Sequence, residues 1–145
     1  MKIRIVILFL LLIASPLRAE PLRIVTEDFP PYNFQVDNKA KGLCSEIVQA
    51  VLKQLNLQVP NEFYPWARAY EIAQAEKNIL IYSIGRLPER EALFHWVGAI
   101  APIKTSLYKL KSNNSVQVNS IIQAKNYLIG ASLGDMRLIY LQRHQ

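Results

Sequence analysis

Three acidic side chains, Glu27, Asp28 and Glu89, lie in segments whose other residues could contact a small molecule. An acid–base catalyst needs a positioned acid and a positioned base. Nothing in the spacing of these three carboxylates marks such a pair. His95 has no second ligand at a spacing typical of a metal centre. The residue types therefore predict neither an enzyme nor a metal site, and we expect no cofactor.

Arg90 could perform a different chemistry, the binding of an anion. The planar fork of a guanidinium donates two parallel hydrogen bonds to a carboxylate, and the charges strengthen both bonds. Arg90 stands between Glu89 and Glu91, so it could equally be a solvated arginine that pairs with one of them. Gly134 and Asp135 precede a predicted helix, whose N-terminal N–H groups could also attract an anion. Asp135 is more simply explained as the cap of that helix.

Aromatic side chains could supply the flat apolar wall that small-molecule pockets usually have. Phe29 and Tyr32 lie in a loop that contains two prolines, and Trp66 stands at the start of a predicted helix. A cationic group of a ligand could stack on such a ring. Each aromatic residue could instead pack inside the protein. Ser83, at the end of a predicted strand, could add a hydroxyl group to a binding site.

The composition is typical of one ordinary globular domain or slightly more. The 145 residues are 51% hydrophobic and 19% charged, which excludes a disordered chain. The formal net charge is +6, but it falls to +3 from Glu20 onward, and the cations are scattered. We therefore expect no nucleic-acid partner. Cys44 is the single cysteine and lies beside an apolar helix face, so we expect it to be buried and inert.

Residues 1–19 have the organisation of a cleavable secretory signal peptide. Two cations precede nine uninterrupted apolar residues at positions 5–13, and Ala19 is a small residue at the expected cleavage site. Nine residues are too few to cross a bilayer, which takes about 20. No cysteine directly follows the site, so a lipid anchor is not expected. The sequence predicts a mature chain that begins at Glu20 and is exported.

Strands and helices alternate along the first part of the mature chain. Apolar and β-branched runs predict strands over 22–27, 58–64 and 79–84, and helical apolar stripes predict helices over 43–55 and 66–76. The continuous apolar run at 79–84 indicates a strand that is covered on both faces. A polar turn is expected over 37–42. The β-α-β-α-β order predicts an α/β fold with a mostly parallel sheet.

A second α/β unit is expected to begin after Pro102. Its predicted strands cover 105–110 and 127–131, and its predicted helices cover 120–125 and 136–143.

Five segments, in this order, resemble the family 3 periplasmic solute-binding proteins, which include the polar-amino-acid receptors of ABC transporters. They are LRIVTEDFPPYNF, the helix over 42–52, PWARAYEIA, SIGRLPERE and WVGAIAP. The resemblance runs from about residue 22 to about residue 140. Its most specific part is PWARA, followed about twenty residues later by LPERE and a phenylalanine.

The resemblance implies a two-lobed clamshell that closes on a ligand about a hinge. Residues 20–101 would form a nearly complete first lobe, 102–108 would cross between the lobes, and 109–145 would form part of the second lobe. Arg90 matches the arginine that grips the ligand's α-carboxylate in amino-acid receptors. Ser83 to Gly85 match a strand end that meets the ligand, and Phe29 matches an aromatic residue that covers it. With the pocket-wall candidates, the predicted ligand-binding residues are Phe29, Tyr32, Trp66, Ser83, Gly85, Arg90, Gly134 and Asp135.

Two departures from the family pattern bear on the ligand. Leu87 stands where amino-acid receptors commonly have threonine, and Asp135 where they commonly have serine or threonine. An acid beside a carboxylate pocket repels an anion, which argues against a plain amino acid and leaves room for a cationic or neutral solute. The family also usually runs well past 200 residues, so we expect a truncated member with weak stability and weak ligand binding. The acidic residue that holds the ligand's amino group would lie beyond Gln145.

These observations favour an exported, periplasmic and monomeric solute-binding protein. Its expected partners are a small polar solute, such as an amino acid or a related compound, and an ABC-type permease. Two alternatives remain open. The chain could be the extracytoplasmic sensor domain of a signalling protein, or a cleft enzyme such as a dehydratase.

Overall fold

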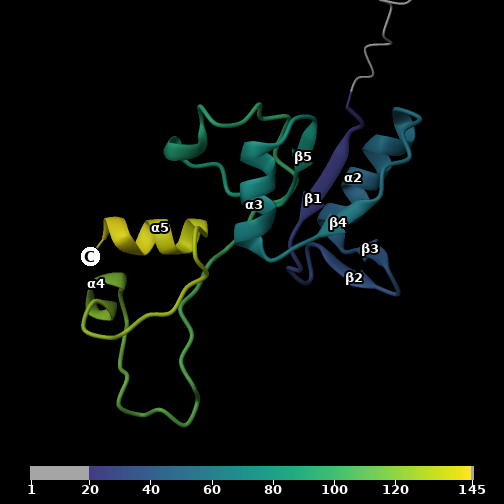
Figure 1. The fold of residues 1–145 in the computed structure, drawn as a ribbon. Helices are drawn as coiled ribbons and strands as arrows, with labels where there is room; N and C mark the ends of the chain where they lie inside the picture. The colour runs from purple at the N-terminus through teal and green to yellow at the C-terminus, as the bar shows by residue number, and fades with distance from the viewer. Residues whose placement is uncertain (1–19, 145) are drawn as a thin grey trace, which may run out of the picture.

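The computed structural model describes residues 20–144, so the predicted signal peptide at 1–19 lies outside the described residues (Figure 1). The elements, in chain order, are β1 (Arg23–Thr26), β2 (Phe34–Val36), β3 (Lys39–Lys41), α2 (Leu43–Gln54), β4 (Asn61–Phe63), α3 (Trp66–Ala75), β5 (Ile79–Ile81), the 3₁₀ turn η1 (Pro88–Arg90), α4 (Ile121–Ala124) and α5 (Met136–Arg143). None of these helices is long and apolar enough to span a membrane.

Strands β4, β1 and β5 form a parallel sheet with β1 in the centre. Each parallel connection passes through a helix, α2 between β1 and β4 and α3 between β4 and β5. This arrangement confirms the predicted α/β class and the β-α-β-α-β order.

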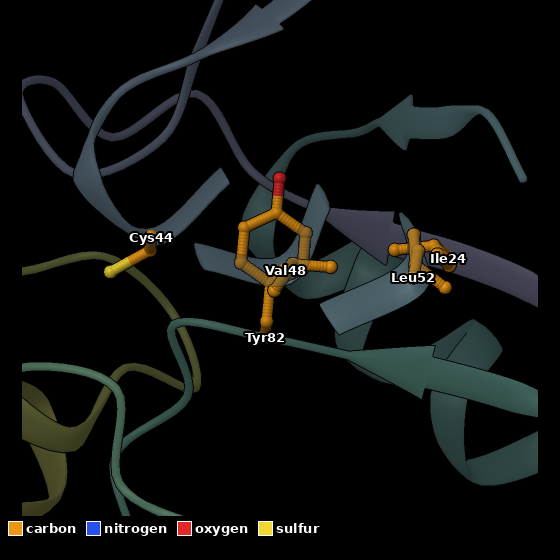
Figure 2. Close-up of a cluster of buried hydrophobic side chains, with 5 residues drawn as sticks. All are labelled: Ile24, Cys44, Val48, Leu52 and Tyr82. Carbon is orange, nitrogen blue, oxygen red and sulfur yellow. The ribbon is translucent and has the colours of Figure 1, made fainter. Parts of the chain in front are cut away.

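The two helices cover opposite faces of the sheet. Successive residues of a strand point to opposite faces, and neither Ile24 nor Val25 of β1 is exposed. Ile24 packs in a cluster with α2 and with Tyr82, which follows β5 (Figure 2). Val25 packs against Ala69 and Ile72 of α3 on the other face. Burying each of these β1 side chains contributes roughly 1.5–3 kcal/mol to stability.

Cys44 belongs to the α2 side of this core and is buried, as the sequence predicted (Figure 2). Only part of the apolar stripe of α2 packs into the core. Val48 and Leu52 are buried, while Ile47 and Val51 are substantially exposed.

Two predictions for the first hundred residues were wrong. The strand covered on both faces is β1, whereas β5 is half-buried because it borders only β1 among the described strands. The segment predicted as a polar turn over 37–42 turns only at Asp37 and Asn38 and continues as β3, which pairs with β2 in a β-hairpin. Asp37 and Asn38 both have positive φ angles, as tight hairpin turns require. The polar sequence of β3 carries no alternating apolar pattern that could have predicted it.

The segment after Pro102 follows the prediction in its helices and not in its strands. Helices α4 and α5 lie within the predicted ranges, but 105–110 and 127–131 form no strand in the described chain. A strand needs a neighbour that accepts its backbone hydrogen bonds, and neither segment has one among residues 20–144. Extended chain instead connects the sheet to α4 and α5, and the N-terminal end of α5 faces the sheet and α3 (Figure 1).

The loop that carries the candidate aromatic residues also caps α2. Helix α2 has no side-chain cap, and the backbone carbonyl of Tyr32 accepts a hydrogen bond from the N–H of Cys44 at 2.8 Å. The carbonyl of Pro31 accepts from Leu43 at 3.4 Å. Gly42 makes this approach possible, since its φ is 98° and a Cβ atom there would lie 2.6 Å from both carbonyl oxygens. The position of the loop therefore depends on a glycine at 42.

We predict that Gly42→Ala destabilises the protein by about 2 kcal/mol or more, because it adds backbone strain and a clash with two carbonyl groups. The free energy of unfolding in urea measures the effect. Gly98→Ala is the matched control, since no atom lies within 4 Å of its added Cβ. The control should change stability by no more than about 0.5 kcal/mol. Equal effects of the two substitutions would contradict the role of Gly42.

Candidate functional site

One small cavity lies where the carboxyl ends of the strands meet the start of α5. Parallel strands end at a common edge of the sheet, so Glu27 after β1, Trp66 after β4 and Ser83 after β5 come together there. The cavity measures about 30 Å³. Its lining residues are Glu27, Phe29, Trp66, Ser83, Gly85, Arg90, Ile103, Thr105, Asp135, Met136 and Arg137.

The structure brings the predicted site residues together. Six of the eight line this cavity, namely Phe29, Trp66, Ser83, Gly85, Arg90 and Asp135. The other two are adjacent to it. The ring of Tyr32 stacks on Phe29 with 5.4 Å between centroids, and the carbonyl of Gly134 accepts a hydrogen bond from Arg90. Their convergence makes the cavity the candidate site, and their contact with a ligand stays a prediction.

Arg90 is the most buried charged residue of the site, with 2% of its surface exposed. Its Nη1 donates to the carbonyl of Gly85 at 2.9 Å, and its Nη2 donates to the carbonyl of Gly134 at 2.7 Å. The guanidinium carbon lies 5.4 Å from the ring centre of Trp66 and 5.0 Å from that of Tyr70. These contacts offset the high cost of burying a charge.

The alternative of a solvated Arg90 paired with a neighbouring glutamate is wrong. Glu89 pairs with Arg143 of α5, and Glu91 pairs with Arg86. Arg90 turns away from both neighbours and into the protein, where it joins η1 to the segment before α5.

Three buried polar atoms of cavity-lining residues have no hydrogen-bond partner among residues 20–144. They are Arg90 Nε, Trp66 Nε1 and Ser83 Oγ. The first two can only donate, and the hydroxyl can also donate. More than nine-tenths of buried polar groups in folded proteins are paired, so three unpaired donors around one cavity indicate a place for an acceptor group.

Ser83 also carries backbone strain at this site. Its φ is 61°, in the left-handed region that residues other than glycine, asparagine and aspartate rarely adopt. Such strain costs about 1–3 kcal/mol and concentrates at functional sites. The strained backbone holds Ser83 between β5 and Gly85, where the residue lines the cavity.

Asp135 caps helix α5, as its residue type suggested. One of its carboxylate oxygens accepts from the backbone N–H of Arg137 at 2.7 Å, and both oxygens accept from the Arg137 guanidinium at 2.7 and 2.6 Å. Burial pushes the pKa of the Asp135 carboxyl upward, but the hydrogen bonds from Arg137 outweigh burial and hold that pKa below its ordinary value. Asp135 is therefore an ionised group at neutral pH.

Glu27 is the second carboxylate of the cavity, and it forms no ion pair with any described residue. Burial raises the pKa of Glu27, and the nearby Asp135 carboxylate raises it further, while Arg137 opposes the change. The cavity thus combines unpaired donors around Arg90 with an acidic side formed by Glu27 and Asp135.

Sequence reasoning missed Met136 and Arg137 as residues of the site. A Cβ atom on Gly85 would collide with the sulfur of Met136, so the glycine lets α5 approach η1 closely. The guanidinium carbon of Arg137 lies 5.5 Å from the ring centre of Phe29. The neighbouring Gly134 and Asp135 pointed to the start of this helix, but the contacts of Met136 and Arg137 depend on how α5 meets the sheet, which no local pattern shows. Among the described residues, no group of histidine, cysteine and acidic side chains could hold a metal ion.

A family model described as "Bacterial extracellular solute-binding proteins, family 3" matches residues 22–134 of the chain. The match contains every predicted site residue except Asp135. Comparisons with curated proteins and with solved structures find no match.

We predict that Glu27→Gln raises the melting temperature at pH 7. Because the folded-state pKa of Glu27 is raised, the folded protein binds a proton there more tightly than the unfolded chain does. The stability of the wild-type protein then falls as the pH rises from the pKa of Glu27 in the unfolded chain to its higher pKa in the folded protein. The loss of stability persists at higher pH. Glutamine carries no charge to bury, so the two melting temperatures should converge below about pH 4.

Thermal unfolding followed by circular dichroism from pH 3.5 to 8 measures this difference. Glu20→Gln is the control, because Glu20 is exposed and does not line the cavity. A lower melting temperature for Glu27→Gln than for wild type at pH 7 would contradict the assignment.

Proposed function

Because the chain belongs to the bacterial extracellular solute-binding proteins of family 3, we propose that it binds a small polar solute whose anionic group is held by Arg90. Arg90 uses two of its five N–H groups on backbone carbonyls, which leaves Nε–H and two others for a ligand. A carboxylate can accept two parallel bonds from such a fork.

The observation that carries this proposal is the group of three unpaired donors at Arg90, Trp66 and Ser83. A carboxylate has two oxygens and about four acceptor positions, enough to satisfy all three donors at once. The rings of Phe29 and Trp66 supply an apolar wall beside these donors. This combination of a few polar groups with aromatic walls is typical of sites for small metabolites.

The cavity, at about 30 Å³, has room for about one or two water molecules and not for an amino acid. Met136 and Arg137 of α5 line this cavity, and Met136 packs closely against Gly85. Solute binding therefore requires α5 to move away from residues 20–101. In this proposal residues 20–101 form one lobe, 102–108 cross between the lobes, and 109–144 belong to the other, which opens and closes the site.

Proteins of this family are typically periplasmic and bind solutes rather than transform them. We infer that residues 1–19 direct export and that the bound solute is an amino acid or a related compound delivered to an ABC-type permease. The acidic side of the cavity, formed by Glu27 and Asp135, favours solutes that carry a cationic or neutral group beside their anionic group.

We predict that a panel of amino acids, small carboxylates and polyamines contains a solute that raises the melting temperature of the chain. Arg90→Ala should weaken binding of that solute by at least about 30-fold, since losing one partner of a buried charged pair costs about 2–5 kcal/mol. Titration calorimetry measures the affinity, with the full chain expressed for export and purified as the host processes it.

Arg68→Ala is the matched control, because Arg68 is an exposed arginine of α3 that pairs only with Glu71 among the described residues. Ser83→Ala is the second test. It removes one unpaired hydroxyl without emptying the core, so it should weaken binding by a few-fold and leave the fold intact. Unchanged affinity in folded Arg90→Ala or Arg90→Lys would contradict the proposed function.

A further inference from the structure

Arg137 of α5 lines the candidate site together with Arg90. It is the second residue of α5, and its guanidinium carbon lies 5.5 Å from the ring centre of Phe29, in the loop after β1. Both residues line the cavity. This contact joins parts of the chain that are more than a hundred residues apart, so it exists only when α5 lies against the sheet.

The surroundings of this guanidinium are those of a cation-binding site. Asp135, with 8% of its side chain exposed, pairs with it through both carboxylate oxygens. Glu27 contributes a second carboxylate, close enough to interact electrostatically with Arg137. An aromatic face together with two carboxylates is the chemistry that recognises a guanidinium or ammonium group.

Asp135 does not need this guanidinium to cap α5. The cap is formed with the backbone N–H of Arg137, which any residue other than proline would supply at that position. The side chain of Arg137 is 35% exposed, so it can rotate into solvent without unfolding its surroundings. The guanidinium therefore occupies the acidic and aromatic side of the cavity while remaining free to leave it.

We propose that Arg137 is an internal competitor that occupies a subsite for the distal cationic group of the solute, and that a solute with such a group must displace Arg137 to bind. This inference rests on the proposed solute-binding function and deepens it: the solute would place its anionic group at Arg90 and a distal guanidinium or ammonium group, at the end of the molecule away from that anion, against Phe29, Glu27 and Asp135. If the subsite is free of Arg137 in only a fraction of the molecules, the apparent affinity for such a solute is reduced in proportion to that fraction. Removing Arg137 therefore strengthens the binding of cationic solutes selectively.

A purely structural role for Arg137 makes a different prediction. If Arg137 only holds α5 against the rest of the protein, its loss should change the affinity for all solutes equally. The loss of another residue that holds α5 should do the same. Arg143 is that other residue, since it pairs with Glu89 of η1 and does not line the cavity. Arg143→Ala is therefore the matched control, because it removes a contact of α5 and leaves Arg137 in the subsite.

Arginine and citrulline are the test ligands, because they share an amino-acid end and a similar length and differ in the charge of the distal group. We expect Arg137→Ala and Arg137→Gln to raise the affinity for arginine about tenfold relative to wild type, and the affinity for citrulline less than about threefold. Arg143→Ala should not favour arginine over citrulline. Titration calorimetry on the exported full chain gives the affinities, and circular dichroism checks that each variant folds.

Equal gains for arginine and citrulline, or an equal preference for arginine in Arg143→Ala, would overturn the internal-competitor proposal. If neutral solutes bind through Arg90 while arginine gains nothing from the loss of Arg137, the proposed function stands and this inference fails. If no solute of the panel binds any variant, the proposed function fails and the inference falls with it.

A second measurement on the wild-type chain keeps the test independent of variant stability. Nitrogen-15 NMR observes the Nε–H group of Arg137, which donates to Asp135 at 2.7 Å. Saturating arginine should abolish the hydrogen-bonded resonance, and citrulline should leave it in place. A resonance that persists with arginine bound would overturn the proposal.

Discussion

The buried charge of Arg90 is the constraint on which the arrangement of the site depends. A guanidinium that is almost fully removed from water must find hydrogen-bond acceptors and polarisable neighbours, or the fold loses several kcal/mol. Arg90 finds them in the carbonyls of Gly85 and Gly134 and in the rings of Trp66 and Tyr70. One of these partners belongs to the segment that leads into α5, so the charge itself holds α5 against the sheet.

The scaffold delivers the remaining groups to that charge by simple means. Parallel strands end at one edge, so the residues that follow β1, β4 and β5 converge without long loops. Gly42 lets the aromatic loop cap α2 and thereby fixes Phe29 and Tyr32 at the same edge. The result is a cavity with hydrogen-bond donors on one side and carboxylates on the other. This arrangement is complementary to a zwitterion, which carries one anionic and one cationic group.

Much of the first α/β unit could be predicted from the sequence because its signals are local. The apolar stripes of α2 and α3 and the apolar runs of β1 and β5 can each be recognised within one short stretch of the sequence. The β2–β3 hairpin was not predicted, since each strand has only three residues and β3 has a single small apolar residue between two lysines. The proposed role of Arg90 came from the resemblance to a family, whereas its residue pattern alone favoured pairing with Glu89 or Glu91. Arg137 was unpredictable because its position depends on a contact between segments that are distant in the sequence.

A crystal structure of the chain with a bound solute tests the central claim most directly, namely that Arg90 is the anion-binding group of a solute site. Such a structure should place an acceptor atom of the solute within about 2.7–3.2 Å of Arg90 Nε and of either Ser83 Oγ or Trp66 Nε1. It should also show α5 displaced from the position that narrows the cavity. A solute bound elsewhere, for example in the hollow between α4 and α5, with Arg90 still bonded only to protein carbonyls, would contradict the account.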